Sequence, residues 1–490
     1  MSRVKSAFAP PSAWRRFMWL GLTLGAMAIV IGSYHWTVRT SGGFNPPGEE
    51  DYYNFLVRGW RGGHLYLSKE PVPEMSKLAD PYDPAQNAPY RLADASYFKG
   101  HYYLYFGAVP AALIMLPYYY VTGSELGTTT TIFIFAVIGF LASSLLWLQI
   151  RRHHFRQSAA WLAPLGILVL GFGSHVLALQ RRPLVWELPI VSAYAFTSLG
   201  LLLVHRLIVY PRTRLALGAG LCFGLAVASR PTYLFATLAI IPACWYLWFR
   251  SGQGRQLTLG LLGVFSLCLT TAFAHNYARF GHFLEFGQNY QLTGIYESKA
   301  THFRPSYFVH NVGIYYFQPP TLTREFPFIS ATVTREGPPG YLGSWNEPVC
   351  GIALTLPFLW LALAVPWSLG HRNNELQPEY RILLGSIVLS FLGLTAVTLS
   401  YFLATPRYMA DFTPTLALLA CLGAAIIERK TVGTWWRRPT VLSMVALGAV
   451  TTLSGLLMST DYHGRLLKTL SPQEWHTLER AFHFFSTKTH

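Results

Sequence analysis

The chain has 490 residues, of which 52% are hydrophobic and 12% charged, and its mean hydropathy is +0.31. Soluble domains carry roughly 25% charged residues, so this composition excludes an ordinary soluble domain and favours a membrane protein with several spans. The net charge of +16 does not indicate nucleic-acid binding, because the basic residues lie in short clusters between apolar runs. Five cysteines lie in or beside these runs without a CxxC pattern or a Cys/His cluster. Neither a disulfide framework nor a zinc site is therefore expected.

Long apolar runs occupy most of the chain. They lie at residues 17–38, 103–122, 127–150, 158–179, 188–209, 214–229, 232–249, 256–274, 349–369, 382–403, 412–427 and 439–459. A basic N-terminal segment precedes the first run, and no small-x-small cleavage site follows it, which predicts a retained signal anchor. The run 103–122 contains Pro110 and Pro117, and each proline removes a helix hydrogen-bond donor.

The basic residues of the short loops predict the topology. Taken in alternation after residue 150, one set of loops holds 14 Lys and Arg residues and the other holds 4. The richer set should be cytoplasmic, as should the basic N-terminus. Both conditions hold if 103–122 lies along the outer interface instead of crossing. The sequence thus predicts an all-α polytopic membrane protein with about eleven spans, its N-terminus inside and its C-terminus outside, in a bacterial cytoplasmic (inner) membrane.

This topology divides the chain into parts. Residues 1–38 form the cytoplasmic N-terminus and first span, and two large outer loops are expected at 39–126 and 275–348. The remaining parts are a transmembrane bundle at 127–274, C-terminal spans at 349–459 and an outer tail at 460–490. Almost all suggestive polar residues fall in the outer loops and turns.

Three acids, Glu49, Glu50 and Asp51, follow the first span in the stretch GGFNPPGEEDYYNFL at residues 42–56. The Gly and Pro residues before them end the span and turn the chain. A carboxylate just beyond a span can act as a general base toward a hydroxyl or an amine. The same acids can also be solvated loop charge, and both interpretations stay open at this stage.

Arginines lie at the same expected depth. Arg181 and Arg182 precede one span, Arg230 separates two spans, and Arg407 precedes a late span. A forked guanidinium matches the oxygens of a phosphate, so these residues could hold a lipid phosphate fixed at the membrane surface. The alternatives are that Arg181 and Arg182 anchor a helix end and that Arg407 pairs with Asp411.

Further polar residues come from the first outer loop and the start of a span. The loop supplies Asp94, Lys99 and His101, and its DPYDP stretch at 80–84 favours turns over metal binding. Glu187 begins a span, where the helix dipole also favours a negative charge.

The order of these features resembles the GT-C membrane glycosyltransferases, especially the family-39-like group that includes protein O-mannosyltransferases and lipid A aminoarabinose transferases. EEDYYNFLVRGWRGGHLYL is similar to the acidic motif of that group's first outer loop, with Asp51 as the best-placed match and Glu50 as the alternative. KGHYYLYFGAVPAALIMLP resembles its interfacial helix but lacks the Pro-Pro pair.

Three other segments extend the resemblance. RRPLVWELPIVSAYAF resembles the segment where a second acid, here Glu187, begins a span, and LGAGLCFGLAVASRPTYLF resembles a Gly-rich span that ends in a basic residue, here Arg230. PRYMADFTPTLALLA resembles the start of a late span with Arg407 and Tyr408.

The resemblance implies a GT-C-like bundle and an inverting transfer of a sugar from a polyprenyl-phosphate donor. The acceptor would be a glycan, lipid or protein at the outer face. Asp51, or Glu50 in its place, would be the general base. The donor and its phosphate would be bound by residues from several turns, namely Arg181, Arg182, Arg230, Arg407, Tyr408, Asp94, Glu187, Lys99 and His101.

The remaining expectations are broader. Asp94 and Glu187 could orient substrate or a divalent metal ion, but no ligand spacing decides whether a metal is used. Membrane lipids are expected partners, and no nucleic acid is. Two other functions stay open: a transporter or flippase for a lipid-linked sugar, and a noncatalytic membrane assembly subunit. A transporter predicts broken helices in two related halves, and the sequence has no evident repeat.

Overall fold

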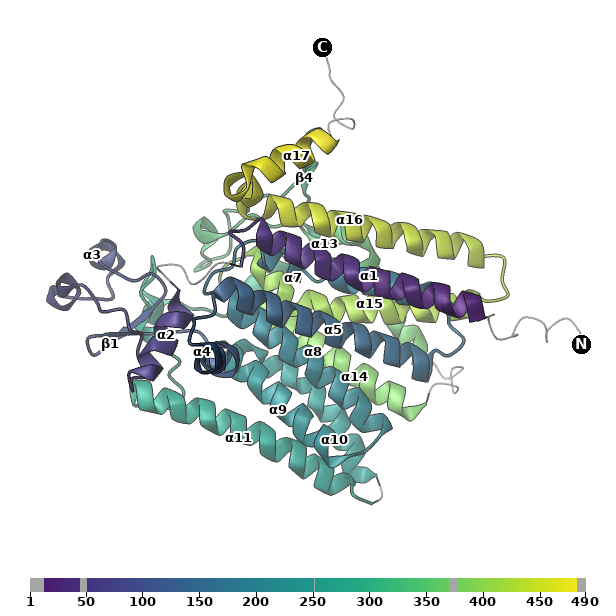
Figure 1. Cartoon of the computed structure of the whole chain (residues 1–490), viewed down its shortest axis with the longest axis horizontal. Helices are drawn as coiled ribbons and strands as arrows, with labels where there is room; N and C mark the ends of the chain where they lie inside the picture. Colours follow the sequence, from purple (N-terminus) through teal and green to yellow (C-terminus); the bar gives the residue numbers. More distant parts are fainter. Residues whose placement is uncertain (1–12, 45–50, 251, 370–376, 483–490) are drawn as a thin grey trace, which may run out of the picture.

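A computed structural model describes residues 13–44, 51–250, 252–369 and 377–482. Its long helices lie side by side in one bundle, with smaller elements gathered mainly at one end (Figure 1). Nine helices are long and apolar enough to cross a membrane within the described ranges. Their spans are Trp14–Arg39, Thr128–His154, Leu162–Leu179, Glu187–Val209, Pro231–Phe249, Gly254–Phe280, Pro378–Leu399, Pro406–Thr431 and Arg437–Leu470. The expected all-α polytopic fold is confirmed.

The helical elements of these spans are continuous or made of two joined pieces. They are α1 (Ala13–Arg39), α5 (Thr128–His154), α6 (Leu162–Phe172), α7 (Val176–Leu179), α8 (Glu187–Val209), η4 (Pro231–Ala239), α10 (Ile240–Phe249), α11 (Gly254–Phe280), α14 (Pro378–Leu399), η11 (Pro406–Tyr408), α15 (Met409–Thr431) and α16 (Arg437–Leu470). Two of the eleven expected spans fall on shorter apolar helices, α9 (Thr213–Ser229) and η9 (Pro357–Ser368). The 3₁₀ helix η9 begins at Pro357 and contains Pro366, which lacks the backbone donor that a regular α-helix would use there.

The remaining elements are short. The first long loop contains α2 (Tyr52–Arg61), η2 (Pro73–Lys77), α3 (Pro84–Asn87), β1 (Ser96–Phe98), β2 (His101–Tyr103), η3 (Ala111–Met115) and α4 (Leu116–Thr122). The second contains η5 (Gln288–Tyr290), η6 (Glu297–Lys299), α12 (Pro305–Val312), η7 (Gly313–Phe317), β3 (Thr321–Leu322), β4 (Ile329–Ser330) and η8 (Gly343–Trp345). The short helix α13 (Ile352–Thr355) precedes η9, and α17 (Pro472–Phe482) follows α16.

The run 103–122 does not form a long helix. After β2 the chain enters the apolar helical stretch Ala111–Thr122, which at 1.5 Å per residue is far shorter than the roughly 30 Å of a bilayer core. Figure 1 shows α4 nearly end-on where α5 and α8 run across the view, so α4 lies crosswise to the bundle. Arg61 fastens it to α2 by lying 3.6 Å above the ring of Tyr119. This geometry suits the expected interfacial position, which stays a prediction.

Small residues let the bundle helices pack closely. The central α15 is almost wholly buried, whereas α11 at the periphery is largely exposed. Gly423 of α15 packs against the backbone of η9, where an added Cβ would lie 1.8 Å from the carbonyl oxygen of Leu361. Such contacts are typical of membrane bundles, because van der Waals packing replaces the hydrophobic drive in lipid.

The two long loops meet at one end of the bundle and are joined by their backbones. The Asp94 amide donates to the Leu292 carbonyl at 2.8 Å, and the Leu292 amide donates to the Ala95 carbonyl at 2.9 Å. The hydroxyl of Ser96 donates to the Gly287 carbonyl at 2.8 Å. Segments some 190 residues apart in the sequence therefore form one wall.

We predict that Gly423→Ala lowers the thermal unfolding midpoint of the detergent-purified protein. The new methyl group must displace the backbone of η9, and overpacking of this kind costs about 1–3 kcal/mol. Gly263→Ala in α11 is the matched control, since an added Cβ there meets nothing within 4 Å and alanine is the better helix former by about 1 kcal/mol. Equal midpoints for the two variants would contradict the packing described for α15 and η9.

Candidate functional site

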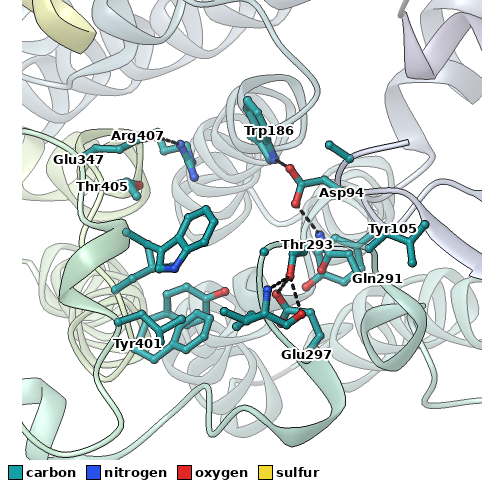
Figure 2. Close-up of a pocket in the computed structure, with 18 of the residues that line it drawn as sticks. Asp94, Tyr105, Trp186, Gln291, Thr293, Glu297, Glu347, Tyr401, Thr405 and Arg407 are labelled. Atoms are coloured by element: carbon teal, nitrogen blue, oxygen red, sulfur yellow. Dashed lines mark hydrogen bonds and ion pairs between the residues drawn. The ribbon is translucent and has the colours of Figure 1, made fainter. Parts of the chain in front are cut away.

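A cavity of about 370 Å³ lies where the two loops meet the bundle (Figure 2). The first loop supplies Asp94 and Tyr105, the second supplies Glu297 and Glu347, and a turn of the bundle supplies Arg407. Aromatic side chains, including Trp186 and Trp345, line much of the remaining wall. Four residues expected from the sequence are among its lining: Asp94, Arg182, Arg407 and Tyr408.

Asp94 is held rigidly and faces the cavity (Figure 2). Its backbone adopts the left-handed region, with φ at +60°, and its amide is tied to Leu292. The indole N–H of Trp186 donates to Oδ2 at 3.1 Å, and the side-chain amide Nε2 of Gln291 donates to Oδ1 at 3.1 Å. Burial raises the pKa of the Asp94 carboxyl, and nearby Arg407 opposes that rise. A partly buried carboxylate with a raised pKa is suited to accept a proton.

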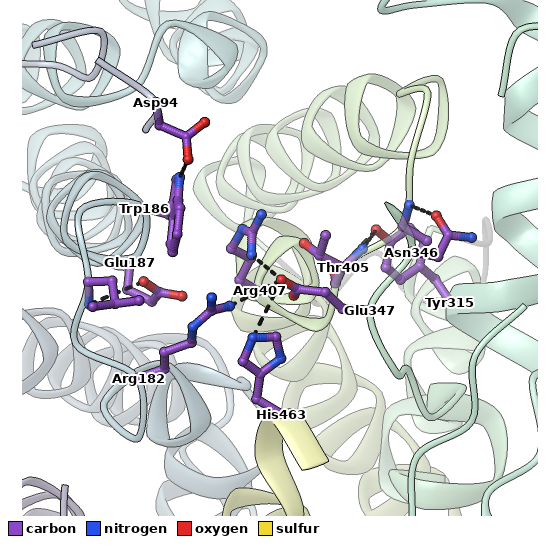
Figure 3. Close-up of polar contacts among 12 residues, drawn as sticks. Asp94, Arg182, Trp186, Glu187, Tyr315, Asn346, Glu347, Thr405, Arg407 and His463 are labelled. Atoms are coloured by element: carbon purple, nitrogen blue, oxygen red, sulfur yellow. Dashed lines mark hydrogen bonds and ion pairs between the residues drawn. The ribbon is translucent and has the colours of Figure 1, made fainter. Parts of the chain in front are cut away.

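Arg182 and Arg407 share one carboxylate (Figure 3). Nη1 of Arg407 lies 2.7 Å and Nη1 of Arg182 lies 3.1 Å from the same oxygen, Oε1 of Glu347. The ring of Trp186 lies 4.8 Å from the Arg182 guanidinium and 5.3 Å from that of Arg407. Burial raises the pKa of Glu347, but Arg407, His463 and Arg182 outweigh it, so the net pKa is lowered. Glu347 was not expected from the sequence.

A second carboxylate of the cavity is supported from behind. Oε1 of Glu297 accepts from the Thr293 hydroxyl at 2.9 Å, and its Oε2 lies 2.7 Å from Nε2 of His302. Glu297 and Thr293 both line the cavity. Neither Glu297 nor Trp186 was expected from the sequence, because their place depends on how the second loop folds over the first.

Arg230 lies beside this cavity but does not line it. Its Nη2 is 2.9 Å from Oδ2 of Asp411, and its guanidinium lies 5.2 Å from the ring centre of Tyr408. The expected alternative that Arg407 pairs with Asp411 is wrong, because Arg230 takes that carboxylate. Arg230 thus contacts Tyr408, which does line the cavity.

Asp51 joins two helices and does not line the cavity. It is the N-cap of α2 and accepts from the Asn54 amide at 3.1 Å. Its carboxylate also accepts from the amide of Thr128 at 3.0 Å and from the hydroxyl of Thr128 at 2.9 Å, at the start of α5. The catalytic role expected for Asp51 stays a prediction. Glu50, the expected alternative, lies outside the described residues.

Arg181 and Glu187 are both fully buried behind the cavity. Arg181 donates to the hydroxyls of Thr40 and Ser41 at 2.6 and 3.1 Å and to the Ser459 carbonyl at 3.2 Å, which ties α1 to α16. Glu187 begins α8, and its Oε2 accepts from the Leu184 amide at 3.3 Å. These contacts fit a structural role as well as the substrate role expected from the sequence.

Lys99 and His101 lie on the hairpin of β1 and β2, away from the cavity lining. Lys99 is exposed in the turn, with φ at +49°. The ring of His101 stacks on Tyr66 with centres 3.9 Å apart. The chain continues from the hairpin to Tyr105, which lines the cavity. The expected binding roles of Lys99 and His101 stay predictions.

A second cavity of about 440 Å³ adjoins the first and shares Tyr105 and Phe106 with it. Its walls are mainly apolar side chains of α9, α11 and the η3 region. Arg279, at the end of α11, supplies its positive charge and is only 8% exposed. Arg279 donates to the Leu104 carbonyl and to Oδ1 of Asn276, each at 2.7 Å.

Arg279 makes no ion pair with a carboxylate anywhere in the described part of the chain, and its Nε has no hydrogen-bond partner there. A buried cation without a counter-ion is costly and usually functional. The sequence signal was an arginine in the last turn of an otherwise apolar span, in NYARFG.

No group of three His, Cys, Asp or Glu side chains within the described ranges is placed to hold a metal ion. The two aspartates of DPYDP instead form turns, since Asp80 accepts from the Tyr82 amide and Asp83 caps α3. Use of a divalent metal stays an untested expectation.

No protein-family model and no curated protein matches the sequence. The fold is similar to that of the archaeal oligosaccharyltransferase AglB from Archaeoglobus fulgidus, whose structure contains an inhibitory peptide and a dolichol-phosphate. The TM-score is 0.50 at 11% identity, over 98% of this chain and 60% of AglB. ArnT from Cupriavidus metallidurans bound to undecaprenyl phosphate matches at a TM-score of 0.48 and 13% identity, over 94% of this chain and 78% of ArnT.

Both proteins are GT-C glycosyltransferases. This chain has the GT-C fold. It is an integral membrane protein, as the composition predicted.

We predict that Asp94→Asn stabilises the folded protein at neutral pH. A raised pKa in the folded state means that the ionised carboxylate is disfavoured there, so wild-type stability falls as pH rises above the ordinary Asp range. The asparagine variant has no such loss. Thermal unfolding midpoints of the two proteins should therefore diverge in favour of the variant between pH 4 and pH 7, and a gap that shrinks over this interval would contradict the burial of Asp94.

Proposed function

We propose that the protein transfers a sugar from a polyprenyl-phosphate-linked donor to an acceptor, with inversion at the anomeric carbon. The observation that carries this proposal is the pair of adjoining cavities that share Tyr105 and Phe106. One is apolar and contains an unpaired arginine, and the other is polar, aromatic and rich in carboxylates. A lipid-linked sugar has the same two-part chemistry.

The apolar cavity suits the carrier. Its walls on α9 and α11 belong to the membrane-spanning bundle, so a prenyl chain can lie there without leaving lipid. Arg279 lines this cavity and makes no ion pair with a carboxylate in the described part of the chain, so its positive charge can attract the carrier phosphate. The dolichol-phosphate and undecaprenyl phosphate of the AglB and ArnT structures agree with such a carrier. Arg279 suits the carrier phosphate better than Arg407, because Arg279 lines the apolar cavity and Arg407 lines the other one.

The polar cavity suits the sugar and the acceptor. Trp186 and Trp345 offer aromatic faces, and Asp94 offers a carboxylate aimed inward. Asp94 takes the proton of the acceptor hydroxyl or amine as the acceptor oxygen or nitrogen attacks the anomeric carbon. The bond from that carbon to the phosphate oxygen breaks, and the polyprenyl phosphate leaves with the electron pair. Arg279 stabilises the charge that grows on the departing phosphate.

Asp51 remains the alternative base, as the sequence resemblance implies. It lies outside the polar cavity lining, and three donors already occupy its carboxylate, so the geometry favours Asp94. A flippase would use the same carrier cavity but would not need an inward-facing carboxylate, and a noncatalytic subunit would need neither. We place the reaction on the outer face of a bacterial inner membrane, with the N-terminus inside.

We predict that Arg279→Gln weakens binding of polyprenyl phosphate to the purified protein in nanodiscs by at least tenfold, because it removes the cation that meets the phosphate. Arg255→Gln is the matched control, since Arg255 is exposed at the other end of the same helix. Affinity can be measured by native mass spectrometry with defined lipid. Unchanged affinity of Arg279→Gln for polyprenyl phosphate would contradict the assignment of Arg279 to the carrier phosphate.

We further predict that Asp94→Asn lowers the rate of sugar transfer by a factor of about 10²–10⁴, the usual contribution of a general base. Donor binding should be retained, because the change is isosteric. Asp51→Asn tests the alternative in the same assay, with radiolabelled polyprenyl-phosphate sugars and membrane extracts as acceptor. A full loss in Asp51→Asn together with an active Asp94→Asn would return the base to Asp51.

A further inference from the structure

Two of the three arginines that line the polar cavity share one carboxylate, and the transfer chemistry above does not use them. Arg182 follows α7 and Arg407 lies in η11, yet both point one Nη1 at Oε1 of Glu347 (Figure 3). One carboxylate oxygen thus serves two cations, and its twin Oε2 is buried without a hydrogen-bond partner in the described structure. These three side chains together have a net charge of +1, and two further carboxyl groups, those of Glu187 and Asp94, also interact electrostatically with Arg407.

The arginines keep donors for a further ligand. Nε and Nη2 of Arg182 and of Arg407 make no hydrogen bond to the described residues, and none of these nitrogens is enclosed by the fold. Both side chains line the cavity, and the ring of Trp186 lies close to both guanidinium groups. A pair of oriented guanidinium forks with free donors matches an oxyanion such as a phosphate or a carboxylate.

Neighbouring hydrogen bonds fix the position of Glu347, whose carboxylate occupies the place that such an anion would take. Its amide donates to the Ala404 carbonyl at 3.0 Å, and the neighbouring Asn346 accepts from the Ala404 amide at 2.7 Å. His463 lies on its far side, with Nε2 3.8 Å from Oε1. The chain reaches this position through a non-helical turn in α16, where His463, Gly464 and Arg465 all have positive φ.

The anion cannot be the carrier phosphate if Arg279 holds that group, because one phosphate does not serve two cavities. The walls around Arg182 and Arg407 include the carboxylates of Glu347 and Asp94, and a prenyl chain packed against them would leave charged groups without solvation, which is costly. The second substrate of the transfer is then the remaining source of an anionic group.

We propose that Arg182 and Arg407 form an anion site for an acidic group, phosphate or carboxylate, of the acceptor, and that Glu347 is the internal counter-ion that occupies this site until the acceptor binds. The inference rests on the proposed function for the identity of the second substrate. The acceptor class it names is an anionic glycan or glycolipid. The acidic group anchors the acceptor, while a hydroxyl or amine elsewhere on the same molecule approaches Asp94.

The test uses methyl phosphate and acetate as probes, titrated calorimetrically into the full-length protein in nanodiscs. An Arg279→Gln background removes the carrier cation, so that probe binding reports only the polar cavity. In that background Arg407→Gln should weaken methyl phosphate binding at least tenfold. Glu347→Gln should tighten it several-fold, because the amide keeps the shape of the side chain but no longer neutralises the arginines.

The opposite signs of these two changes separate an anion site from a merely structural network, in which both substitutions would weaken binding. Preference for methyl phosphate or for acetate identifies the acidic group. Equal probe affinity in all three proteins would overturn the proposal.

Polyprenyl phosphate binding is measured in parallel with single variants. Loss in Arg407→Gln with retention in Arg279→Gln would make the pair the carrier site, which overturns this inference and leaves sugar transfer intact. Absence of any polyprenyl phosphate binding, with the probe results as expected, would instead end the proposed function and leave the anion site standing.

Discussion

The site depends on the backbone pairing between Asp94–Ala95 and Leu292. These two hydrogen bonds fasten the first long loop to the segment that follows α11, and a carbonyl of the same segment accepts from Arg91 at 2.8 Å. The join places Asp94 and Gln291 in contact and brings Glu297 to the opposite wall of the cavity.

Each acidic side chain that lines this cavity has a close hydrogen-bond or ion-pair partner. The lining contains three arginines and three acids, and each acid has a different kind of neighbour: Trp186 and Gln291 for Asp94, His302 and Thr293 for Glu297, arginines for Glu347. In a region of low dielectric, burial and these partners together decide which carboxylate stays ionised. Burial raises the pKa of Asp94 more than nearby Arg407 lowers it, whereas at Glu347 the surrounding cations outweigh burial and lower the pKa.

Hydropathy was enough to predict the bundle, because a bilayer demands long apolar helices whatever their partners. The polar residues beside span ends were also predictable, and Asp94, Arg182, Arg407 and Tyr408 do meet in the cavity. Glu347, Glu297 and Trp186 were not, since their neighbours come from distant loops whose pairing leaves no local periodicity. Asp51 shows the converse limit: an acid in a suggestive motif makes the local hydrogen bonds of a helix cap, which the motif alone does not reveal.

The wall formed by Tyr105 and Phe106 bears on the order in which the two substrates can bind. It is anchored by Gly107, which packs so closely on the carbonyls of Ala228 and Ser229 that no side chain would fit. In the proposed reaction the carrier occupies one side of this wall and the acceptor the other, so neither substrate has to leave before its partner enters. Such a separation of the two substrates predicts a ternary complex and sequential kinetics. The spent carrier should compete with fresh donor but not with acceptor.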